Sequence, residues 1–249
     1  MTKNGINVQG DAVTAATTNV ALAMRALERA MNRDPHLPGL VGFYGPAGLG
    51  KSFGAAYAAN QHRAYYIEIK STWTKKKLLE SILQEMQIKP ARTIYEMADQ
   101  AAEQLALCER PLIIDQFDIL IDRSSVEIIR DLHDAAGSAP ILLIGEEEME
   151  KNLRRWERFH SRMLEWIPAQ PATLDDARKL RALYCPHVDV ADDLLHHIHQ
   201  VSRGGTRRIC INLSRVQEFG IAADLALVNL QDWGNQELYT GEAIRRRAA

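Results

Sequence analysis

Short apolar runs alternate with helical patterns along the first two thirds of the chain. Five runs are too short for helices, and most are bounded by proline or glycine, which is typical of β-strands. These runs are Leu40–Tyr44, Ala64–Ile69, Leu112–Asp115, Ile141–Ile144 and Met163–Ile167. The first four are apolar enough to predict strands that are well buried.

The segments between these runs repeat apolar residues at helical spacing. They predict helices over Ser52–Gln61, Lys75–Met86, Ile94–Cys108, Ser124–Ala136 and Glu147–Phe159. An earlier helical pattern extends from Asp11 to Asn32 and stops before Pro35. Strands that alternate with helices predict an α/β fold, with a parallel sheet covered by helices on both faces.

The pattern changes after Pro168. Helices are expected over Thr173–Tyr184, Ala191–Val201 and Thr206–Phe219, with no strands between them. We therefore divide the chain into an N-terminal leader and helix (1–35), a core (36–169) and a helical appendage with a basic tail (170–249).

A phosphate-binding motif follows the first predicted strand. The residues Gly45, Pro46, Ala47, Gly48, Leu49, Gly50, Lys51 and Ser52 fit GxxxxGK(S/T), and the motif opens a predicted helix, as its chemistry requires. Lys51, expected to be exposed at the loop, would reach the β- and γ-phosphates of ATP, and Ser52 would ligate Mg²⁺. A glycine-rich turn without a ligand is the alternative interpretation.

The third predicted strand ends in Asp115, which would orient the water shell of the metal. The next residue is Gln116, where hydrolytic P-loop ATPases usually place a glutamate that activates the attacking water. Three interpretations remain open. Asp118 or another carboxylate compensates, or turnover is simply slow; the protein binds ATP and hydrolyses it poorly; or Gln116 was introduced to trap the ATP state.

Composition limits the possible partners. A net charge of -2 argues against a uniformly basic nucleic-acid coat, so any contact with nucleic acid must be local. The three cysteines lack CxxC spacing and suit a reducing cytosol. No signal peptide or membrane-spanning run is present in the sequence. We expect a soluble cytoplasmic protein without a membrane partner.

From about Asn19 to Arg208 the chain resembles AAA+ ATPases, and most narrowly the Mu-type phage transposition protein B group, with the Tn7-type target regulators and insertion-sequence helper ATPases as wider relatives. The resemblance rests on the order of the motifs Thr18–Val20, Gly45–Ser52, Trp73–Thr74, Leu112–Leu120, Arg130–Asp134, Leu143–Glu146 and Phe159–Arg162. It implies a P-loop AAA+ core with a parallel five-stranded sheet flanked by helices, followed by a small C-terminal helical lid.

The resemblance also implies roles for single residues. Arg162 matches the arginine finger that reaches the γ-phosphate held by a neighbouring subunit, and Arg207 matches the sensor-2 arginine of the lid. Asn19 falls in the segment that precedes the first strand and would join the ATP site. Glu146 occupies the sensor-1 place, where Asn, Ser or Thr is more usual, and this departure, like Gln116, favours slow hydrolysis.

Lys75, Lys76 and Lys77 open a predicted helix after the second strand. In relatives this region lines a channel that holds DNA, so we expect duplex DNA contacts here, with a solvated surface as the alternative. Trp73 is packed or stacked on a base. The tail residues Arg245–Arg247 are a weaker candidate for DNA contact.

The family resemblance predicts an ATP-dependent protein that binds DNA without sequence preference in a bacterial host cell. It would form helical or ring-like homo-oligomers on target DNA and recruit or activate a transposase. A helicase-loader-like ATPase of DNA replication is the alternative. A P-loop phosphotransferase is a third possibility, but no second substrate constellation supports it.

Overall fold

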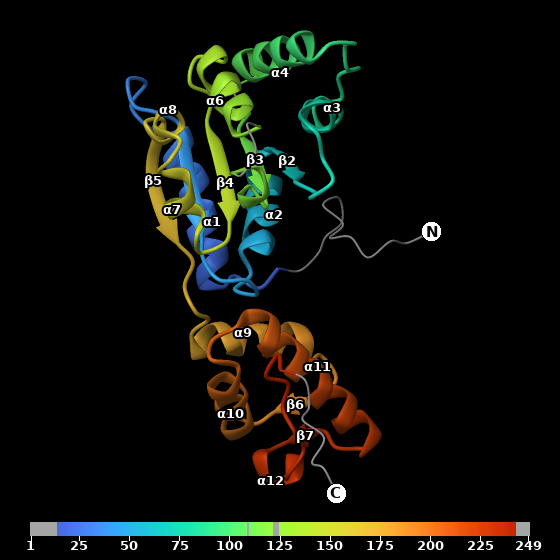
Figure 1. Cartoon of the computed structure of the whole chain (residues 1–249). Helices are drawn as coiled ribbons and strands as arrows, with labels where there is room; N and C mark the ends of the chain where they lie inside the picture. The colour runs from blue at the N-terminus through green and yellow to red at the C-terminus, as the bar shows by residue number, and fades with distance from the viewer. Residues whose placement is uncertain (1–13, 109, 122–124, 243–249) are drawn as a thin grey trace, which may run out of the picture. The chain divides into compact units, whose positions relative to one another are not determined.

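The computed structural model describes residues 14–108, 110–121 and 125–242 (Figure 1). Its described residues form two compact units. The first contains residues 20–47 and 51–169, and the second contains residues 14–19, 48–50 and 170–242. The tail residues Arg245–Arg247 and the start of the leader lie outside the described residues.

The first unit is built on a parallel sheet of five strands in the order β2-β3-β4-β1-β5. The strands are β1 (Leu40–Tyr44), β2 (Tyr65–Glu68), β3 (Leu112–Asp115), β4 (Ile141–Gly145) and β5 (Met163–Pro168). The predicted five-stranded parallel sheet is confirmed. Because all strands run the same way, the residues that follow β1, β3 and β4 meet at one edge.

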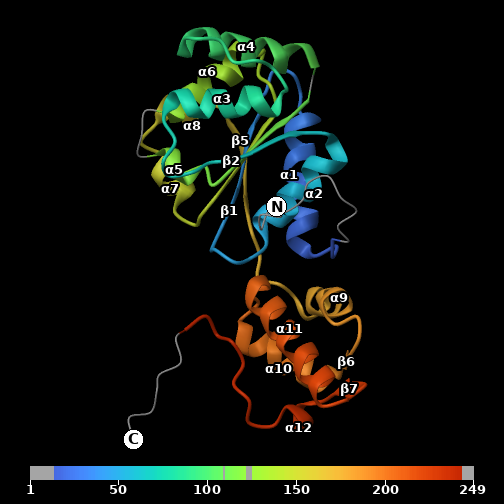
Figure 2. The same ribbon diagram turned by 90° about the vertical axis from the view of Figure 1, so that its right-hand side faces the viewer.

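Helices cover both faces of this sheet. They are α1 (Thr18–Met31), α2 (Lys51–His62), α3 (Lys75–Glu85), α4 (Ile94–Cys108), α5 (Asp118–Ile121), α6 (Val126–Ala135), α7 (Met149–Leu153) and α8 (Glu157–His160). Figure 2 shows α1 and α2 on one face and α5, α7 and α8 on the other. The main apolar core joins β-strand residues to buried side chains of α3, α4 and α6, such as Leu79, Met97 and Ile129.

Three details of the first unit differ from the sequence-based expectation. The helix expected from Asp11 begins at Thr18. The helix expected over Glu147–Phe159 is interrupted, because the indole of Trp156 donates a hydrogen bond to the Ile121 carbonyl at 2.9 Å and the chain turns to make it. The strand β2 is not fully buried, since it lies at the edge of the sheet and alternates buried and half-buried residues.

The second unit is mainly helical, with α9 (Leu174–Tyr184), α10 (Asp192–Ser202), α11 (Thr206–Ala222) and α12 (Leu230–Trp233). The expectation of no strands was wrong, because β6 (Asp189–Val190) and β7 (Leu227–Val228) form a short parallel pair. Its core packs Leu180, Leu195 and Leu213 with neighbouring apolar residues. None of the described helices is long and apolar enough to cross a membrane.

Candidate nucleotide-binding site

The loop between β1 and α2 has the backbone of a phosphate cradle. Gly45, Gly48 and Gly50 have φ angles of 149°, 83° and 87°, which other residue types rarely adopt. A Cβ atom added at Gly45 would lie 3.2 Å from the Cβ of Ala169. The loop leads into α2, a helix of 12 residues whose first N–H groups have no helical partner. This combination of glycines and a helix N-terminus fits a phosphate group.

Lys51 lies inside this loop. Its side chain donates from Nζ to the carbonyls of Gly45 at 2.5 Å and Pro46 at 2.8 Å. Only 9% of the residue is exposed, so the expectation of an exposed lysine was wrong. Burial lowers the pKa of Lys51, and the nearby carboxylates, Asp115 first, act in the opposite direction. The two carbonyl contacts hold Nζ at the loop that would bind the phosphates.

Asp115 ends β3 and is 2% exposed. Its Oδ2 accepts a hydrogen bond from the Tyr66 hydroxyl at 2.8 Å, and its Oδ1 accepts one from the Gln116 N–H, also at 2.8 Å. Burial raises the pKa of Tyr66, and the adjacent Asp115 raises it further, so Tyr66 remains a donor. These two bonds fix the orientation of the Asp115 carboxylate.

Gln116 follows Asp115 with a φ angle of 57°, in the left-handed region. Its side-chain Nε2 donates to Oε1 of Glu68 at 2.6 Å, and Lys70 pairs with the same oxygen at 2.7 Å. Asp118, the carboxylate considered as a substitute, instead accepts the Glu146 N–H at 3.2 Å. Burial raises the pKa of Asp118. Residue 116 is thus paired with Glu68, not with Asp118.

The donor set suits magnesium better than a metal held by protein alone. Among the described residues, no group of three or more His, Cys, Asp or Glu could hold an ion. Mg²⁺ in nucleotide sites usually keeps several waters and takes one or two protein oxygens together with phosphates. Ser52, at the start of α2, and Asp115 would be those protein groups.

Within the second unit, residues of α1 and α11 hold the tip of the loop. The Asn19 side chain donates to the carbonyls of Leu49 at 2.8 Å and Gln170 at 2.7 Å, and accepts the Gln170 N–H at 2.9 Å. The Thr206 hydroxyl also donates to Leu49, at 3.0 Å, and the Arg207 N–H donates to the Gly48 carbonyl at 2.9 Å. Asn19 therefore positions the loop in this structure, and its contact with ATP stays a prediction.

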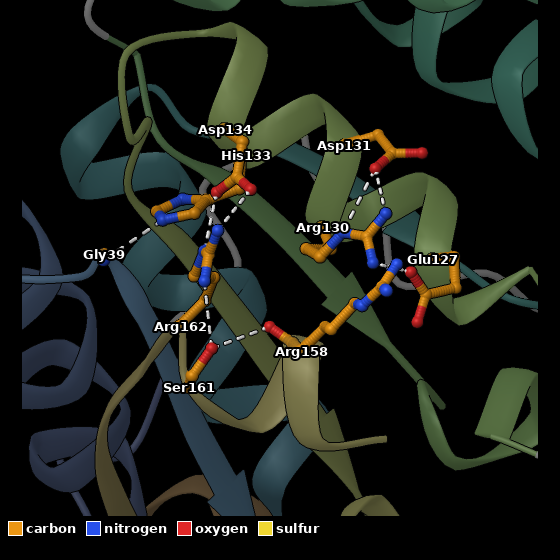
Figure 3. Close-up of polar contacts among 9 residues, drawn as sticks. All are labelled: Gly39, Glu127, Arg130, Asp131, His133, Asp134, Arg158, Ser161 and Arg162. Atoms are coloured by element: carbon orange, nitrogen blue, oxygen red, sulfur yellow. Dashed lines mark hydrogen bonds and ion pairs between the residues drawn. The ribbon is translucent and has the colours of Figure 1, made fainter.

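Arg162 lies just before β5 and forms a bidentate ion pair with Asp134 of α6 (Figure 3). Nε and Nη2 donate to the two carboxylate oxygens at 2.9 Å each, and Nη1 donates to the Ser161 hydroxyl at 2.9 Å. Hydrogen bonding to Arg162 lowers the pKa of Asp134. The arginine and aspartate side chains are 39% and 38% exposed. Arg162 is therefore oriented but accessible to solvent.

Arg162 and the phosphate loop lie at opposite ends of β1. The Arg162 carbonyl accepts the N–H of Leu40, the first residue of β1, whereas Gly45 follows its last residue. Five strand residues span about 16 Å, at about 3.3 Å each. Lys51 and Asp115 lie at the carboxyl edge of the sheet, so Arg162 lies at the opposite edge from these two side chains of the same chain.

Lys75, Lys76 and Lys77 form the first turn of α3, which follows β2. The Thr74 hydroxyl caps this helix by accepting the Lys77 N–H at 3.2 Å. Lys76 Nζ lies 4.0 Å from Glu80 Oε1, and such a solvent-accessible pair neutralises little of the lysine charge. Trp73 is partly buried against the main core, which answers the question of its packing.

Sequence reasoning missed Tyr66, Glu68 and Thr206 as parts of this site. The residues of Tyr65–Glu68 alternate between buried and half-buried in the structure, but the sequence carries no signal for this because the segment begins with two tyrosines. Such alternation indicates one face that points away from the core, here beside Asp115 and Gln116. Thr206 had no sequence signal either, since its contact with Leu49 joins positions far apart in sequence.

Residues 35–153 match the family model of the AAA domain. The described residues have the α/β AAA fold, with the sheet order β2-β3-β4-β1-β5 and C-terminal helices. A search of curated protein sequences finds no significant match to the chain.

Three solved structures illustrate the similarity in fold. The Aeropyrum pernix ORC1 protein in complex with DNA aligns with a TM-score of 0.62 and 15% identity, covering 90% of this chain and 66% of that one. The Thermotoga maritima RuvB Holliday junction branch migration motor aligns with a TM-score of 0.56 and 19% identity, covering 86% of this chain and 66% of that one. Cdc6p from Pyrobaculum aerophilum aligns with a TM-score of 0.59 and 14% identity, covering 84% of this chain and 62% of that one. The chain thus spans slightly less than two thirds of the length of each.

Proposed function

We propose that the protein is an ATP-dependent DNA-binding protein that assembles with copies of itself on target DNA and recruits or activates a transposase. The observation that carries the proposal is the placement of Arg162 at the opposite end of β1 from the phosphate loop. An accessible arginine that lies away from the phosphate loop of its own subunit is suited to serve the nucleotide of a neighbouring subunit.

The nucleotide part of the proposal rests on the cradle and its charges. Three glycines with positive φ, the enclosed Lys51 ammonium and the oriented Asp115 carboxylate match the groups that ATP and Mg²⁺ require. Arg207, at the start of α11, donates its N–H to the Gly48 carbonyl of the same unit and has an exposed side chain. Its role as the sensor-2 arginine rests on the family resemblance.

The DNA part rests on repetition of a small basic surface. The net charge of -2 gives one copy little attraction for a polyanion. Lys75, Lys76 and Lys77 offer a local patch, and each neutralised phosphate adds to binding and to its salt dependence. Assembly driven by ATP would place many such patches along one duplex, which converts nucleotide state into DNA affinity.

The similarity in fold to an ORC1 protein in complex with DNA is compatible with this role but does not identify the partner. Recruitment of a transposase rests on the resemblance to the Mu-type transposition protein B group. A helicase-loader-like ATPase remains the alternative. Pull-down of the ATP-bound protein with a transposase or with a replicative helicase, each purified, decides between them.

The DNA part is tested by filter retention of labelled duplex over a salt series, with ATP, ADP or no nucleotide. We expect retention only with ATP, and loss of retention when Lys75, Lys76 and Lys77 are changed to Glu. The matched control changes Arg25, Arg178 and Lys179 to Glu, which alters net charge equally at other exposed sites. Equal retention in all nucleotide states, or full retention by the Lys75–Lys77 variant, would contradict the proposal.

A further inference from the structure

The side chain at position 116 is held by a carboxylate from a different strand. Gln116 Nε2 donates a short hydrogen bond of 2.6 Å to Glu68 Oε1. The positive φ of Gln116 and the bond from its N–H to Asp115 fix the backbone at this point. A glutamate, Glu68, is therefore hydrogen-bonded to Gln116, the residue that stands where P-loop ATPases usually have their catalytic glutamate.

The register of the sheet explains how Glu68 reaches this position. Strands β2 and β3 are parallel neighbours, with Ile67 opposite Ile114 and Glu68 opposite Asp115. Tyr66 and Glu68 are two residues apart on β2 and share one face. The first bonds to Asp115 and the second to Gln116, so one edge-strand face supports both residues at the end of β3.

Asp115 and Asp118, the carboxylates on either side of Gln116 in the sequence, are less suited to accept a proton. Both oxygens of Asp115 already accept hydrogen bonds, from Gln116 and Tyr66. Asp118 is bonded to the Glu146 backbone. The Glu68 side chain is 41% exposed, and both of its described partners, Gln116 and Lys70, use Oε1. Within the described part of the chain this leaves the lone pairs of Oε2 available.

We infer that Glu68 supplies the carboxylate that activates water for ATP hydrolysis, with Gln116 orienting it from the adjacent strand. This inference rests on the proposed ATP-dependent function and deepens it. Glu68 takes one proton from water as the water oxygen bonds to the γ-phosphorus. The bond from that phosphorus to the bridging oxygen breaks, its electron pair leaves with ADP, and Glu68 then releases the proton to solvent.

The test exchanges the two side chains, because Glu and Gln have nearly the same shape. Four proteins are compared: wild type, E68Q, Q116E and the exchanged double variant E68Q/Q116E. A general base contributes about 10²–10⁴-fold to rate, so E68Q should lose hydrolysis by about that factor. The double variant should keep turnover at or above the wild-type rate. E85Q is the matched control, since Glu85 also contacts β2, through the Tyr66 N–H at 3.3 Å.

Further measurements use readouts other than the rate of ATP hydrolysis. E68Q should bind ATP as tightly as wild type, and its ATP-dependent assemblies on DNA should last longer, because the nucleotide persists. Q116E alone places a second carboxylate beside that of Glu68, and repulsion between the two raises the pKa of this carboxylate pair in the folded state. Its melting temperature should therefore fall as pH rises from 5 to 8, and the double variant should lose this dependence because the hydrogen bond is restored.

The outcomes separate this inference from the proposed function. Failure of the wild-type protein to bind ATP would contradict both. ATP binding and assembly by a wild-type protein that does not hydrolyse ATP would overturn the role of Glu68 alone. Equal turnover and equal assembly lifetimes for E68Q and E85Q would also overturn it, and would leave the Glu68–Gln116 bond as a structural contact.

Discussion

Replacement of Arg162 by alanine tests whether this residue acts between subunits or only within one. The matched variant is D134N, which breaks the same ion pair but keeps the arginine. Both side chains are more than one third exposed, and exposed pairs are worth about 0.2–1 kcal/mol. For a chain of this size, 1 kcal/mol shifts the melting temperature by about 2–4 °C. Both variants should therefore melt within about 4 °C of wild type.

The two variants should differ strongly in assembly. A hydrogen bond to a charged group contributes about 1.5–3 kcal/mol, and about 1.4 kcal/mol is a tenfold change in an equilibrium constant. R162A should therefore need about 10–100-fold more protein to assemble in the presence of ATP. D134N frees Arg162 from a competing partner, so it should assemble at the wild-type concentration or at a concentration up to about fivefold lower.

Sedimentation velocity over a concentration series, with ATP and with a non-hydrolysable analogue, measures this directly. The analogue removes any effect of turnover. Binding of ATP to dilute protein should be the same in all three proteins, because Arg162 lies at the opposite end of β1 from the phosphate loop of its own chain. Wild-type assembly by R162A would refute the reasoning, and so would a loss of assembly by D134N as large as that of R162A.

Three further predictions concern single groups. K51A should abolish tight ATP binding by calorimetry and lower the melting temperature by several degrees, because Nζ also bonds to Gly45 and Pro46; ATP binding at wild-type affinity would show that the site is misplaced. Y66F should weaken the Mg²⁺ dependence of ATP binding by about 10–100-fold, since Tyr66 orients Asp115, and an unchanged magnesium titration would contradict this. Burial lowers the pKa of His133, so the neutral ring contributes stability above about pH 6.5 that is lost as pH falls toward the folded pKa. Thermal melts from pH 8 to pH 5 should show this slope, H133Q should flatten it, and the exposed His36 should serve as the control in H36Q.

Elements whose pattern is local were predicted well from the sequence. The strands β1 and β3 and the helix α4 begin and end at the predicted residues, because proline, glycine or a change of periodicity marks their ends. The division between α7 and α8 was not predictable. It depends on a hydrogen bond from Trp156 to Ile121, which only the folded structure brings together.

In the candidate site, residues in contiguous motifs were also predicted, and residues brought together only by folding were not. The phosphate loop and Asp115 follow from motifs that are contiguous in sequence. Glu68 and Tyr66 belong to the site through the register of two parallel strands, which no local pattern specifies. The burial of Lys51 was missed because its carbonyl partners come from the loop conformation, not from residue types.

Arg162 and the phosphate loop lie at opposite ends of β1, so an assembly in which the arginine of one subunit meets the nucleotide of the next would be polar, with two different ends. A head-to-tail contact uses two different surfaces, so it either closes into a ring or continues as a filament. In a growing filament, a K51A subunit would still offer Arg162 to the ATP of one neighbour, but it would hold no ATP for the Arg162 of the other neighbour. An R162A subunit would hold ATP but would offer no arginine. Each variant, added in small amounts to wild type, would then block growth at one end only, and the two ends would be opposite. The direction of growth along DNA becomes measurable from which variant stops it.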